Sequence, residues 1–160
     1  MKKIYKLAAG AMLALSLMTQ CGVSTPESAL QKALNAEDYA KIEVLVEKDW
    51  AQRSTLNCEA VVTDVAAYIM LIQKDMDNQN LDDCFLKEER AKELMSLIPD
   101  SDGFQDFKKD FKKEAGIELE DFLKQMEQIF SVVDMMKAFK DGAESSLDSL
   151  NSTIPDGLLY

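Results

Sequence analysis

The chain has 160 residues, with 18 lysines and arginines against 29 aspartates and glutamates, and a formal net charge of −11. Three of the basic residues and none of the acidic ones precede Cys21, so the remainder carries a net charge of −14. Nucleic-acid binding depends on lysines and arginines that neutralise phosphates, and an anionic membrane surface repels a domain of this charge. We therefore expect no nucleic-acid partner.

The first 20 residues have the pattern of an export signal. Lys2, Lys3 and Lys6 precede an apolar run at residues 7–18, and Cys21 follows it. A basic start before a short apolar segment is typical of a secretory signal peptide. The run has twelve residues, whereas a helix needs roughly 20 to span a bilayer. The pattern therefore predicts a signal peptide at residues 1–20 and no permanent transmembrane anchor.

The cysteine after this run resembles the processing site of bacterial lipoprotein precursors. Leu17 stands one place earlier than the leucine of the family's lipobox, and Gln20 occupies a position where a small residue is usual. The resemblance implies that Cys21 carries lipid, palmitate included, and anchors the chain to the bacterial membrane through a tether at residues 21–25. It also implies an extracytoplasmic place in the cell envelope, with Gly22 favouring the outer over the inner membrane. The alternative is an unlipidated export signal that is cut a few residues later.

Beyond the tether, apolar residues recur with the helical period, and alternating strand patterns are nearly absent. We predict an all-α fold, a compact bundle of about five to six helices over residues 26–142. A Ser-rich C-terminal tail at residues 143–160 is expected to follow it.

The first two helices are expected to form a hairpin. Thr25 and Pro26 suit the start of the first helix, which ends near Leu34, and the second covers about residues 37–48. This pair resembles one helix pair of a tetratricopeptide repeat, although no second copy follows at the repeat period of about 34 residues. The fold prediction therefore includes a TPR-like hairpin at the N-terminal end.

Four more helices are expected. They cover about residues 56–76, 87 to just before Pro99, 104 to near Gly116, and 118–140. The last carries the longest apolar stripe, which includes Phe122, Met126, Val133 and Phe139. Gly142 is expected to end it.

The three cysteines give an odd count for an exported protein. Lipidation of Cys21 leaves Cys58 and Cys84, and disulfides persist in an extracytoplasmic compartment. We therefore predict a disulfide between Cys58 and Cys84.

The sequence offers no arrangement of residues that is typical of catalysis. It has no histidine, which removes the commonest general base and metal ligand, and it has no Gly-rich phosphate loop. Asp75 and Asp77 begin a segment like a calcium loop, but Asn80 and Leu86 stand where such a loop needs glycine and glutamate. We expect no enzyme activity, no catalytic residue, no metal and no cofactor.

Apolar residues are the remaining candidates for function. The candidate interaction surface comprises Phe104, Phe107, Phe111, Leu158, Leu159 and Tyr160. A helical domain with such a surface suggests a non-catalytic adaptor or assembly factor that binds another envelope protein. The alternative is a carrier or sensor that holds an apolar ligand between its helices.

Overall fold

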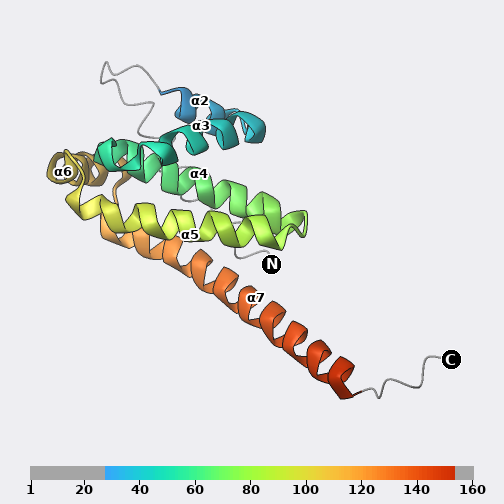
Figure 1. Cartoon of the computed structure of the whole chain (residues 1–160). Coiled ribbons are helices and arrows are strands. Elements are labelled where there is room, and N and C mark those ends of the chain that lie inside the picture. The colour runs from blue at the N-terminus through green and yellow to red at the C-terminus, as the bar shows by residue number, and fades with distance from the viewer. Residues whose placement is uncertain (1–27, 154–160) are drawn as a thin grey trace.

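The computed structural model describes residues 28–153, with side chains described as far as residue 145. Six α-helices occupy most of this part: α2 (Ala29–Asn35), α3 (Tyr39–Ala51), α4 (Cys58–Asp77), α5 (Leu81–Leu97), α6 (Phe104–Ala115) and α7 (Leu119–Thr153). Two short 3-10 helices, Arg53–Thr55 and Ile98–Asp100, lie between them. The predicted all-α bundle is confirmed (Figure 1).

Helix α4 lies at the centre of the bundle. Every residue from 61 to 72 is buried, so α4 is covered all round, whereas a surface helix buries only one stripe. Helix α5 packs antiparallel along it, and α2, α3, α6 and α7 supply the remaining cover (Figure 1). Helix α4 is therefore the core helix of the bundle, and each of the other five helices contacts it.

The predicted N-terminal hairpin is formed by α2 and α3. Helix α2 begins at Ala29, because the Ser28 hydroxyl accepts a hydrogen bond from the Gln31 amide, and the Gln31 side chain accepts one from the Ser28 amide. Such a capping box satisfies two amides that the helix itself leaves unpaired. The start proposed at Thr25 and Pro26, the tether and Cys21 all lie outside the residues that the structure describes.

Two predicted helix boundaries are wrong. Helix α5 begins at Leu81 rather than near residue 87, and its acidic first turn, Asp82 and Asp83, suits the positive end of the helix dipole. Helix α7 continues through Gly142 to Thr153, so Gly142 does not end it and residues 143–153 are helical.

The two glycines near helix ends behave differently for a conformational reason. Gly116 has a left-handed backbone, with φ of 71°, and its amide closes α6 by donating to Lys112. Gly142 is not among the glycines with positive φ, so the chain there stays helical. A glycine inside a helix costs only about 1 kcal/mol relative to alanine, which its neighbours can offset.

The predicted disulfide is wrong. Cys58 and Cys84 are both free and buried. Cys58 begins α4, whereas Cys84 lies beside Asp75, near the other end of that helix. Seventeen residues of helix separate Cys58 from Asp75, which corresponds to about 25 Å. A disulfide needs Cα atoms within about 7 Å, so the antiparallel packing of α4 and α5 prevents the bridge.

We expect both thiols to resist a disulfide-exchange reagent in the folded protein. Burial raises the pKa of Cys58 and raises that of Cys84 to about 11, so little thiolate forms at neutral pH. The test is thiol titration of a Cys21→Ser variant with and without denaturant. Two thiols that react only after unfolding would agree with the structure, and an unreactive chain that needs prior reduction would contradict it.

Candidate functional site

The aromatic residues proposed as an interaction surface belong to the core instead. Phe111 is fully buried and Phe107 nearly so, while Phe104 is half-buried against the same cluster. The ring centroid of Phe111 lies 5.8 Å from that of Phe107 and 5.1 Å from that of Phe122 on α7. These contacts fix α6 against α7, so this part of the predicted surface is wrong.

The other half of that prediction, Leu158, Leu159 and Tyr160, lies outside the described residues. That part of the interaction surface stays a prediction.

A different apolar surface is exposed on α7. Phe139 has 80% of its surface exposed and Met135, one turn earlier, 57%. The sequence had placed Phe139 in the buried stripe with Val133. Six residues of helix rotate a side chain by about 240°, so Phe139 points about 120° away from the buried Val133. A helical wheel would have separated the two positions.

The exposed residues on the same side of α7 as these two side chains carry no charge. We define the Phe139 face as Met135, Ala138, Phe139, Gly142 and Ala143, which share one side of α7 and are all exposed. In Figure 1, the C-terminal half of α7 runs out beyond the other helices. The chain as a whole has 29% charged residues, so an uncharged helix face with two large apolar side chains is unusual here.

Ion pairs join charged side chains of α7 to α5, and the Phe139 face points away from α5. Lys137 contacts Glu89 at 3.1 Å and Lys140 contacts Asp82 at 2.5 Å. Surface pairs of this kind contribute little to stability. The buried apolar stripe of α7, which includes Phe130 and Val133, fixes which side of the helix faces the bundle.

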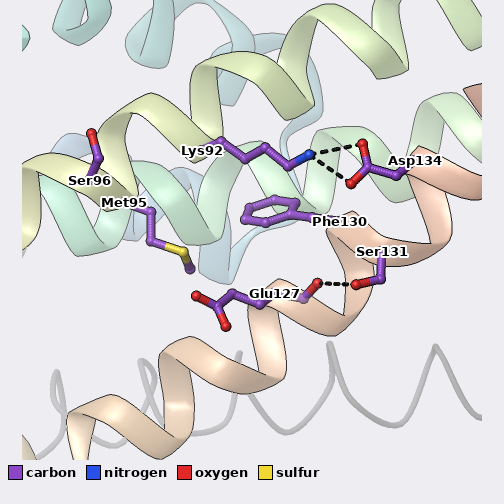
Figure 2. A pocket seen from close by; sticks show the side chains of 7 residues that line it. All are labelled: Lys92, Met95, Ser96, Glu127, Phe130, Ser131 and Asp134. Atoms are coloured by element: carbon purple, nitrogen blue, oxygen red, sulfur yellow. Dashed lines mark hydrogen bonds and ion pairs between the residues drawn. The ribbon is translucent and has the colours of Figure 1, made fainter.

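An open pocket of about 390 Å³ lies between α5 and α7, beside these ion pairs. Figure 2 shows its lining, in which the Lys92 ammonium reaches both carboxylate oxygens of Asp134, each at 2.9 Å. Lys92 also pairs with the buried Glu88 at 2.7 Å and lies 5.9 Å from the centroid of the Phe130 ring. Burial alone would lower the pKa of Lys92, but the two carboxylates outweigh it and raise that pKa.

The pocket therefore contains an ion pair, between Lys92 and Asp134, that joins α5 to α7. Its outer part is lined by Met95, Ser96, Glu127 and Ser131, and the Ser131 hydroxyl donates back to its own helix (Figure 2). An apolar ligand needs an enclosed and mostly apolar site. This pocket is open and is lined by the charged side chains of Lys92, Glu127 and Asp134, so it gives no support to the carrier hypothesis.

The part of the chain that the structure describes holds neither a metal-binding cluster nor a membrane-spanning helix. Within residues 28–153 no group of three or more acidic or cysteine side chains is placed to hold a metal ion. No helix there is both long enough and apolar enough to cross a bilayer.

The fold defines an all-α bundle whose exposed candidate site is an apolar helix face. Comparison with protein-family models, with curated proteins and with solved structures finds no match for the chain.

Proposed function

We propose that this chain is a non-catalytic adaptor or assembly factor of the bacterial cell envelope that binds another protein through the Phe139 face. In this proposal Cys21 carries lipid and anchors the domain to the membrane, and Gly22 favours the outer membrane over the inner one. The proposed localisation is supported by the signal-like segment before Cys21. The support for binding is the exposed apolar pair on α7.

The Phe139 face is the observation that carries the binding proposal. Single exposed apolar residues are normal on protein surfaces. Phe139 and Met135 differ because they lie at i and i+4 on one uncharged face, which is the spacing with which a helix inserts anchors into an apolar groove. Aromatic side chains at such positions often supply most of the binding free energy.

The expected partner has an apolar groove with a basic rim. An uncharged face at the contact centre needs no buried counter-charge from the partner. The net charge of −14 after Cys21 attracts basic residues at longer range and favours fast association. No comparable observation favours a ligand carrier.

Replacing Phe139 by glutamate should abolish partner binding and leave the fold intact. The measurement is crosslinking in intact cells followed by mass spectrometry, with recovery of the same envelope protein quantified for each variant. Loss of a central aromatic anchor typically costs 2 kcal/mol or more, so we expect recovery to fall at least about tenfold. Because Phe139 makes little contact with the bundle, the free energy of unfolding should change by no more than about 0.5 kcal/mol.

Val44→Glu is the matched control, because Val44 is an apolar residue 69% exposed on a different helix, α3. It should leave partner recovery unchanged. Equal recovery with Phe139→Glu and with the unmodified chain would contradict the proposed surface. A Cys21→Ala variant tests the membrane localisation separately. We expect it to lose both palmitate labelling and membrane association.

A further inference from the structure

Asp64 is a buried acid that the rest of the protein does not neutralise. It lies on α4 with 1% of its surface exposed, and neither carboxylate oxygen has a hydrogen-bond donor among the described residues. The other buried acids of the bundle do have cationic partners. Asp75 pairs with Lys87 at 2.5 Å, and Glu88 pairs with Lys92 at 2.7 Å.

The side chain within hydrogen-bonding reach of Asp64 is another acid, Asp49 of α3. Two carboxyl groups can share a hydrogen bond only when one of them carries a proton. Asp49 is half-buried, and its Oδ1 accepts from the Gln52 side-chain amide at 3.4 Å, so Asp49 has a donor that Asp64 lacks. The proton therefore belongs on Asp64, which is the more deeply buried.

The charged groups around this pair are engaged elsewhere. Arg90 of α5 pairs with Glu47 of α3, and Arg53 pairs with Glu93 of α5 at 2.6 Å. Tyr68, one turn beyond Asp64 on α4, is fully buried, and burial raises the pKa of its hydroxyl to about 12. Tyr68 therefore stays neutral, and Arg90, which lies beside the Tyr68 hydroxyl, already has Glu47 as its counter-ion.

We propose that Asp64 and Asp49 share one proton, and that this carboxyl pair is a pH-sensitive latch between α4 and α3. When Asp64 is protonated, its hydroxyl donates to the Asp49 carboxylate in a charge-assisted hydrogen bond. When the proton passes to solvent, two negative charges face each other, and the one on Asp64 is buried. The latch therefore holds the hairpin of α2 and α3 most firmly in acid and weakens as the pH rises.

The pH window follows from the two states of Asp64. Burial, with the neighbouring charge of Asp49, raises its pKa from 3.8 to about 8 in the folded protein. Between these values the closed hairpin binds a proton that the opened chain does not bind, so opening becomes easier with each unit of rising pH. Above about pH 8 both states are deprotonated, and the effect levels off.

The test is hydrogen exchange of backbone amides in the purified protein from pH 5 to 9, corrected for base catalysis. We expect protection of the α2 and α3 amides to fall at least tenfold between pH 5 and 8, and protection of those in α4 and α5 to fall less. Asp64→Asn should remove this dependence, because its amide can donate to Asp49 at every pH. The same pH dependence in Asp64→Asn would overturn the proposal.

A second measurement needs no folded variant at that position. The carboxyl carbon resonance of Asp64 in the unmodified protein should titrate with a midpoint within about one unit of pH 8, and Asp49→Asn should lower that midpoint. A midpoint below pH 6 in the unmodified protein would overturn the shared proton. Neither experiment involves the Phe139 face, so failure here is distinct from failure of the proposed function.

Discussion

Replacing Lys87 by alanine is expected to lower the free energy of unfolding by about 3–5 kcal/mol, the range for removing one partner of a buried ion pair. Lys87 is buried on α5, where its ammonium contacts Asp75 at 2.5 Å and Glu43 at 3.1 Å. Burial alone would lower the pKa of Lys87, but these two acids raise it, so the side chain stays charged. Its removal leaves the carboxylate of Asp75 buried without a counter-charge.

Urea unfolding at neutral pH measures this effect. The control is Lys124→Ala, because Lys124 is exposed and its ion pair with Asp121 is long, at 3.9 Å. We expect the free energy of unfolding to change by no more than about 0.5 kcal/mol. Combining Lys87→Met with Asp75→Leu should recover much of the lost stability, since apolar pairs of similar volume often replace a buried ion pair. A change below about 1 kcal/mol for Lys87→Ala would show that water reaches Asp75.

The second large effect is expected from Phe111→Ala, at about 3–5 kcal/mol. The Phe111 side chain is entirely buried, and its ring packs between those of Phe107 and Phe122. Truncation removes this apolar area and leaves a cavity that α6 and α7 cannot close without moving.

Phe139→Ala is the matched control, because the same truncation at an 80% exposed position should change stability by no more than about 0.5 kcal/mol. Thermal unfolding of both variants gives the comparison. Similar losses for the two would contradict the assignment of one phenylalanine to the core and the other to the surface. A small loss for Phe111→Ala alone would place α6 outside the cooperative unit.

Much of the fold could be predicted because its signals are local. The helical period of apolar residues predicted the all-α class, and Gly116 ends α6 where expected because its backbone is left-handed. The hairpin of α2 and α3 was also predicted from short-range spacing. Each of these depends on residues within one or two turns of each other.

The errors arose where the outcome depends on distant residues. The pairing of Cys58 with Cys84 followed from a count, but the antiparallel register of α4 and α5 separates them. The stop at Gly142 failed because a glycine ends a helix only when its backbone turns left-handed.

The candidate site shows the same division. The sequence identified amphipathic helices, yet the exposure of Phe139 and the burial of Phe111 depend on which neighbours cover each face. The sequence did not predict that Asp64 is buried, because a single acid in an apolar helix is usually exposed to solvent. Its meaning came only with Asp49 from another helix.

By itself the sequence determined the helical class, the charge of −14 after Cys21, and the signal-like segment from which the envelope address is proposed. These are properties of composition and short-range periodicity, which no packing arrangement can change. Only the tertiary structure decided that the two thiols stay apart, which phenylalanine is exposed, and which acid lies without a cation. Burial and pairing are relations between helices, and one helix's pattern does not specify the side chains that another brings against it.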